Sequence, residues 1–133
     1  MEYNWSRFLN KMKINPATSQ RAIAELASNI DFKLPGDYLD FIAEVDGCEG
    51  MIGNTYLSLW RAEDLIGSNE NYRTNEFAPG YFIIGSNLGG TAYAFNKKDG
   101  SVISFELISM LMEDRPFLLG RSFTEFLLSL VSA

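Results

Sequence analysis

Apolar positions repeat with a helical period in the first part of the chain and with a strand period in much of the second. The clearest helical segment covers residues 37–45 and follows a Pro-Gly pair, which breaks whatever precedes it. Asp37 can cap its first turn or interact favourably with the positive end of its dipole, and Gly47 stands where helices commonly end in a left-handed residue. Its apolar residues fall at i, i+3, i+4 and i+7 and form one stripe, made of Tyr38, Phe41, Ile42 and Val45. The opposite face carries Asp37, Asp40 and Glu44, so we expect this helix to show carboxylates to water.

Other segments with the same period are predicted to be helices. One lies near the start of the chain and ends at Pro16, and the next begins at Thr18 or Ser19. Another covers residues 62–71, and the last opens with a capping box whose first member is Ser122. The residues expected to face the core are Trp5, Phe8, Leu9 and Met12; Ala22, Ile23, Leu26 and Ile30; Leu65 and Ile66; and Phe123, Phe126, Leu127, Leu130 and Val131.

Short apolar runs bounded by glycine, asparagine and aspartate predict β-strands. They cover residues 56–60, 81–85, 91–95 and 101–106, with Asp99-Gly100 in a hairpin turn before the last, and residues 107–112 are ambiguous. Helices, then antiparallel strands, then a closing helix predict an α+β fold. We expect a single domain over residues 1–133, with a mixed, largely antiparallel sheet flanked by N-terminal, middle and C-terminal helices.

Composition limits the class of protein. The chain has 133 residues, of which 47% are apolar, enough for one domain with a hydrophobic core. Its first residues lack the pattern of a signal peptide, and no apolar run approaches the roughly 18 residues that a spanning helix needs. The single cysteine, Cys48, fits a reducing compartment. We therefore expect a cytoplasmic protein.

The net charge of −6 is concentrated in the middle of the sequence. Residues 34–76 hold nine acids against two bases, whereas residues 1–33 hold three acids against five bases and residues 77–133 hold five against four. Such a negative field repels nucleic acid and anionic membranes and attracts a basic partner. It equally fits a solvated face that only keeps the protein soluble, so both interpretations stay open.

Residues that carry catalysis are scarce. The chain has no histidine, which removes Ser-His-Asp, Cys-His and most zinc arrangements. Cys48 lacks a neighbouring base, and the acid pairs at residues 63–64 and 113–114 lack any neighbour that would tune a catalytic pKa. A glycine-rich turn lacks the ending of a phosphate loop, and no calcium-loop spacing appears. We expect no enzymatic activity, no cofactor and no metal, and an enzyme built on paired carboxylates stays as a third hypothesis.

The order of these features resembles one known family. Leu34-Pro35-x-x-Tyr38-x-x-Phe41-Ile42-x-x-x-x-Gly47 is similar to the helix motif LP-x-x-Y-x-x-F-L-x-x-x-N-G of the SUKH superfamily. Later features follow in that family's order over residues 20–131, namely Leu57 to Trp60, Asp64-Leu65, Asn69-x-Asn71-Tyr72, Phe82-Ile83-Ile84-Gly85, Gly89-Gly90, Tyr93-x-Phe95 before Asp99-Gly100, and Ser122-Phe123-x-x-Phe126-Leu127.

Two positions depart from the pattern of that family. Asp46 stands where asparagine usually precedes the glycine, which adds negative charge but still suits a helix end. The turn at residues 86–90 lacks the aspartate often found beside these glycines, so no polar role is carried over to it.

The resemblance implies an α+β fold without enzymatic activity. The superfamily contains bacterial immunity proteins, which bind and neutralise a cognate toxin, and fungal regulators of cell-wall assembly. Our first hypothesis is an immunity protein that occludes a basic toxin, such as a nuclease, with its acidic surface and binds neither nucleic acid nor membrane. The alternative is an intracellular regulatory or scaffold domain without a toxin partner. The residues expected to contact the partner are Asp37, Asp40, Glu44, Asp46, Glu49, Glu63, Asp64, Glu70, Tyr72 and Glu76.

Overall fold

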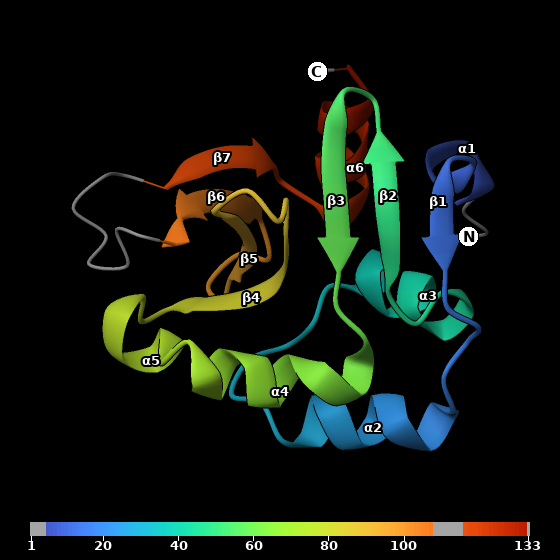
Figure 1. Ribbon diagram of the computed structural model, residues 1–133. Helices are drawn as coiled ribbons and strands as arrows, with labels where there is room; N and C mark the ends of the chain where they lie inside the picture. The colour runs from blue at the N-terminus through green and yellow to red at the C-terminus, as the bar shows by residue number, and fades with distance from the viewer. Residues whose placement is uncertain (1–4, 108–115, 133) are drawn as a thin grey trace.

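The computed structural model describes residues 5–107 and 116–132, and these form one seven-stranded sheet with helices packed around it (Figure 1). The helices are α1 (Ser6–Leu9), α2 (Gln20–Ser28), α3 (Gly36–Glu44), α4 (Ala62–Asn71), α5 (Thr74–Phe77) and α6 (Phe123–Ser132). The strands are β1 (Met12–Ile14), β2 (Cys48–Ile52), β3 (Thr55–Leu59), β4 (Tyr81–Ser86), β5 (Thr91–Asn96), β6 (Val102–Glu106) and β7 (Phe117–Gly120). Each described strand pairs antiparallel with the next one in sequence. The predicted α+β fold is therefore confirmed, with every described pairing antiparallel.

The sheet turns sharply between β3 and β4. These strands share only the pairs Ser58 with Ser86 and Leu59 with Gly85, after which the chain leaves β3 for α4. A side chain at Gly85 would collide with the Ser58 carbonyl, so glycine permits the close crossing. As a result, β1 to β3 stand at an angle to β4 to β7 (Figure 1).

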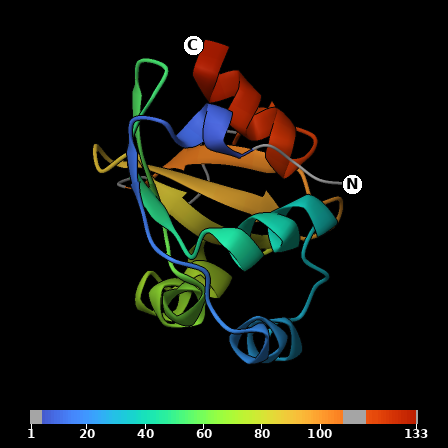
Figure 2. The same cartoon turned by 90° about the vertical axis from the view of Figure 1, so that its right-hand side faces the viewer.

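An aromatic cluster fills the main core, where α3 and α6 cover one face of β4 to β6 (Figure 2). Tyr38 of α3 packs with its ring centroid 5.0 Å from Phe95 of β5 and 5.0 Å from Phe123 of α6. The ring centroid of Phe41 lies 4.9 Å from that of Phe123 and 5.2 Å from that of Trp5. The apolar stripe predicted for residues 37–45 thus faces the core. Burial of such rings supplies most of the stabilising free energy of a small domain.

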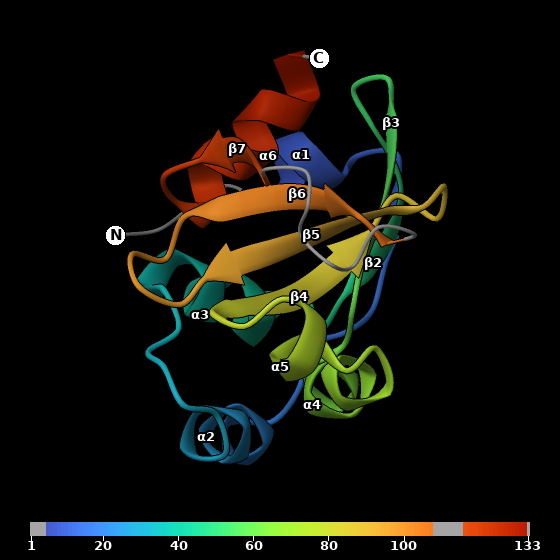
Figure 3. The ribbon, with the colours of Figure 1, turned by 90° about the vertical axis from the view of Figure 1, so that its left-hand side faces the viewer.

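On the other side of the domain, α2 and α4 pack side by side below β4, with the short α5 next to them (Figure 3). Buried Asn69 of α4 joins this layer to the sheet. Its side-chain Nδ2 donates to the Ile83 carbonyl at 2.9 Å, and the Ile83 backbone N–H donates to its Oδ1 at 2.8 Å. The carboxamide therefore pairs with β4 as another strand would, at a position that β3 does not reach.

Several helix boundaries agree with the sequence-based predictions. Ser19 caps α2 by accepting the Ala22 N–H at 3.1 Å, and Ser122 accepts the Glu125 N–H at 3.1 Å at the start of α6. Residues 62–71 form α4 as expected. Val131 was predicted to pack inward, but it is 43% exposed near the end of α6.

The first predicted helix is wrong beyond Leu9. Met12 begins β1, which pairs with β2 at the edge of the sheet. Neither strand was predicted. In β2, Gly50 and the flanking glycines interrupt the alternation of apolar and polar residues by which a strand is recognised. The short α5 and β7 were also not predicted. Of the ambiguous segment 107–112, only Leu107 lies within the described residues.

We expect Asn69→Ala to lower the free energy of unfolding by about 2–4 kcal/mol, since the Ile83 N–H and C=O both lose a buried partner. Urea denaturation followed by circular dichroism measures this change. Asn71→Ala is the matched control, because Asn71 is exposed on the same helix and its loss is expected to cost less than about 0.5 kcal/mol. Equal losses for the two variants would show that Asn69 does not hold β4.

Cys48 is buried in β2, and this burial raises the pKa of its thiol to about 12. Because only the thiolate attacks disulfide reagents, we expect the folded protein at pH 8 to react with 5,5′-dithiobis(2-nitrobenzoate) at least about 100-fold more slowly than the protein in urea. Rapid reaction of the folded protein would show that the thiol is accessible and ionised.

Candidate protein-binding surface

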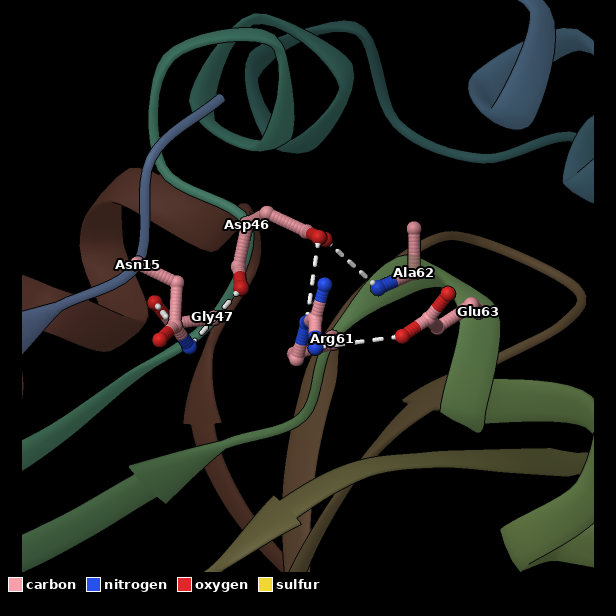
Figure 4. Close-up of polar contacts among 6 residues, drawn as sticks. All are labelled: Asn15, Asp46, Gly47, Arg61, Ala62 and Glu63. Atoms are coloured by element: carbon pink, nitrogen blue, oxygen red, sulfur yellow. Dashed lines mark hydrogen bonds and ion pairs between the residues drawn. The ribbon is translucent and has the colours of Figure 1, made fainter. Parts of the chain in front are cut away.

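The start of α4 is held by a buried carboxylate. Asp46, which follows α3, is only 2% exposed. Its Oδ1 accepts the backbone N–H of Ala62, the first residue of α4, at 2.8 Å, and its Oδ2 accepts from Arg61 Nε at 3.3 Å (Figure 4). A carboxylate at the positive end of a helix is stabilising. Asp46 therefore caps α4 from a distant point in the chain.

The backbone around Asp46 is fixed from the other side by Asn15, which follows β1. The Asn15 carboxamide donates to the carbonyls of Asp46 at 3.1 Å and of Gly47 at 3.3 Å (Figure 4). Gly47 has φ +85°, and a Cβ there would lie 2.8 Å from the Leu59 carbonyl oxygen, so only glycine fits without strain. Three segments far apart in sequence thus meet where α4 begins.

This geometry gives a physical reason for aspartate at residue 46. A carboxylate can accept from both Ala62 and Arg61, whereas an asparagine would offer one acceptor oxygen and turn its NH2 group toward one of the two donors. Burial removes Asp46 from the set of carboxylates that a partner could contact directly.

Asp37 also has an internal role. Of the two roles that the sequence suggested, it does not cap its own helix with a side-chain hydrogen bond, but it does lie in the first turn, at the positive end of the helix dipole. Its Oδ2 instead accepts the backbone N–H and the hydroxyl of Thr124, at 2.8 and 2.9 Å. Asp37 therefore caps α6 and ties it to α3, and its carboxylate is half-buried.

Three more of the predicted contact residues are exposed but engaged with neighbours. Glu63 pairs with Arg61 at 3.1 Å and Glu76 pairs with Arg73 at 3.1 Å. Glu49 on β2 accepts from the Tyr56 hydroxyl at 2.9 Å, and this hydrogen bond raises the pKa of Tyr56. Surface pairs of this kind exchange partners at little cost, so these acids stay accessible to another protein.

Asp40, Glu44, Asp64 and Glu70 are exposed and form no ion pair with any residue that the structure describes. Asp40 and Glu44 are one turn apart on the outer face of α3. Asp64 lies in the first turn of α4 and Glu70 in its last turn. We call these four residues the free carboxylates.

The acidic residues do not form one continuous face, because α4 separates two hollows. One hollow, of about 350 Å³, is lined by Glu49 and Asp64 together with the bases Lys13 and Arg61. The other, of about 510 Å³, lies between α2, α4 and β4 and is lined by the acids Asp31, Glu70 and Glu76 together with the bases Arg73 and Lys97. Sequence reasoning missed Asp31, because it lies in the part of the chain where bases outnumber acids.

An aromatic pair lies beside the smaller hollow. Trp60 lines this hollow, and Tyr72 stacks on Trp60 with ring centroids 5.9 Å apart and an interplanar angle of 4°. Tyr72 remains 39% exposed. Tryptophan and tyrosine carry much of the binding energy at protein interfaces, so this pair is a suitable anchor beside the carboxylates.

Other kinds of site were also sought. In residues 5–107 and 116–132, no group of three or more His, Cys, Asp or Glu side chains is placed to hold a metal ion. Of the two acid pairs considered for catalysis, residues 113–114 lie outside the described residues, and Glu63 is engaged by Arg61. None of the described helices has the length and apolar character that a bilayer crossing requires.

Comparison with known proteins adds to this geometry. A model of the SMI1/KNR4 family (SUKH-1) matches residues 17–129 of the chain. No curated protein matches the chain. This match covers nearly the same part of the chain as the motifs that resemble the superfamily, which lie in residues 20–131. The protein therefore belongs to the SMI1/KNR4 family (SUKH-1).

Proposed function

We propose that this protein is an immunity protein that binds a cognate toxin with a basic surface and neutralises it by occlusion. Family membership supports a SUKH-type immunity or regulatory domain. The observation that carries the finer proposal is the set of free carboxylates, which are exposed on α3 and α4 without a cation from the described part of their own chain. Such groups retain their full attraction for lysine and arginine on a partner.

The mechanism depends on carboxylates that are held in place before binding. Asp46 and Asn69 fix the two ends of α4, so Asp64 and Glu70 project from a helix that does not have to reorganise. Preorganisation lowers the entropic cost of association. Carboxylates paired with the cations that a toxin uses on its substrate would exclude that substrate, and Trp60 with Tyr72 would contribute apolar contact.

Co-expression tests the proposed function directly. We expect the product of the neighbouring gene to arrest growth when expressed alone, growth to be restored when this chain is co-expressed, and the two proteins to co-purify. A harmless neighbour that does not bind would contradict the immunity proposal and favour the regulatory alternative.

The charge-neutral double variant Asp40→Asn/Glu44→Gln tests the acidic contact. Both residues are exposed on α3, so the fold is expected to stay intact. We expect the association rate with the toxin at low salt to fall by about 3- to 10-fold, and the remaining salt dependence to weaken. Stopped-flow or surface plasmon resonance measures both quantities.

The matched control is Glu25→Gln/Glu125→Gln, which removes two exposed acids from α2 and α6 and leaves the same net charge. It is expected to change the rate much less than the α3 variant. Equal effects of the two variants would mean that only net charge matters. Salt-independent association of the unmodified protein would remove the electrostatic argument.

A further inference from the structure

Although the chain is acidic, four of its eleven lysines and arginines line one hollow. This hollow has a volume of about 300 Å³ and is lined by the loop before α3, the β5–β6 hairpin and the loop before α6. The ribbon views show where these three segments lie (Figures 2 and 3). The loop before α3 contributes Lys33, the hairpin contributes Lys97 and Lys98, and Arg121 precedes α6. We call it the basic hollow.

The positive charge of the basic hollow is only partly balanced. Lys97 is engaged by Asp31 at 2.9 Å and lies over the Phe32 ring. Lys33, Lys98 and Arg121 are exposed and form no ion pair with a described residue. Among the described residues that line the hollow, Asp99 is the one acid. Three bases against one acid leave two positive charges.

The nearby acids are turned to other partners. Asp99 Oδ1 accepts from both the backbone N–H and the hydroxyl of Ser101, at 2.9 and 2.7 Å, and so closes its own hairpin. Asp37, in the first turn of α3, is directed at Thr124. Asp99 also interacts with the charge of Arg121 and so balances one base of the hollow, whereas Asp37 is committed to the start of α6.

We propose that the basic hollow binds a compact dianion of the phosphate type, held by Lys33, Lys98 and Arg121. A phosphate group carries about −1.5 to −2 charges at pH 7, which matches the two unbalanced positive charges. Arginine and lysine are the side chains that bind phosphate oxygens through charge-assisted hydrogen bonds. The first turn of α3 adds the favourable end of a helix dipole at Gly36, where open space surrounds the backbone.

The remaining surface limits the ligand to a small anion. An extended polyanion that reached beyond the basic hollow would approach the acidic residues of α3 and α4, which repel it. The phosphate can be free or carried by a small molecule such as a nucleoside monophosphate. This site shares none of the free carboxylates and does not depend on the proposed function.

Titration with inorganic phosphate at constant ionic strength, followed by two-dimensional 15N–1H NMR, tests this proposal. We expect saturable shifts of the amide signals of Gly36 and Gly100, which both line the basic hollow. The double variant Lys98→Ser/Arg121→Ser is expected to weaken the apparent affinity by at least about 10-fold. The spectrum of each variant also reports whether it is folded.

The control variant Lys11→Ser/Lys13→Ser removes two exposed bases around β1 and is expected to keep the phosphate response. Sodium chloride that produces the same shifts at equal ionic strength, or an unchanged affinity in the double variant of the hollow, would overturn the proposal. A titration with adenosine monophosphate distinguishes the two possible ligands. If it binds more tightly than phosphate, the ligand is a nucleotide; if it binds equally, the ligand is free phosphate. A single-stranded oligonucleotide that binds more tightly than either would contradict the compact ligand.

Discussion

The structure depends on how the backbone N–H and C=O groups of β4 find hydrogen-bond partners where β3 diverges from β4. After two residue pairs the strands diverge, and the Ile83 N–H and C=O on the edge of β4 would remain without partners. Buried polar groups of this kind cost about 1–3 kcal/mol each when they are unsatisfied. The Asn69 carboxamide supplies both bonds, and it can do so only if α4 runs directly below β4. One side chain thus determines where the helical layer attaches to the sheet.

The other end of α4 follows the same principle with different chemistry. Asp46 closes the first turn of α4 from the end of α3, and Asn15 holds the backbone behind Asp46. Asp37 links α3 to the start of α6 in a similar way. The starts of α4 and α6 are therefore positioned by carboxylates supplied by other elements, while the aromatic cluster between α3, α6 and the sheet provides most of the apolar burial.

Local sequence patterns predicted the elements whose stability is local. The period of residues 37–45, the serine caps at Ser19 and Ser122 and the hairpin ending at Gly100 all concern neighbouring residues, and the structure agrees with them. Local patterns failed where contacts with residues far away in the sequence determine the structure. Met12 joins a strand because β2 offers an edge, and Asp37 caps a helix 87 residues away. For the candidate surface, the sequence identified the acidic residues but could not show that Asp46 is buried or that α4 divides the others.

Different residues attach α4 to the domain and face solvent, and this difference affects which substitutions the domain can tolerate. The residues that hold the helix are Asp46 and Asn69, whereas Glu63, Asp64, Gly67, Glu70 and Asn71 face solvent. Substitutions at the solvent-facing positions change charge and shape and leave the hydrogen bonds of Asp46 and Asn69 in place. The outward side of α4 can therefore vary in sequence without weakening the attachment of this helix to the rest of the domain. The side chains that attach α4 and the side chains that it exposes to solvent are therefore different residues.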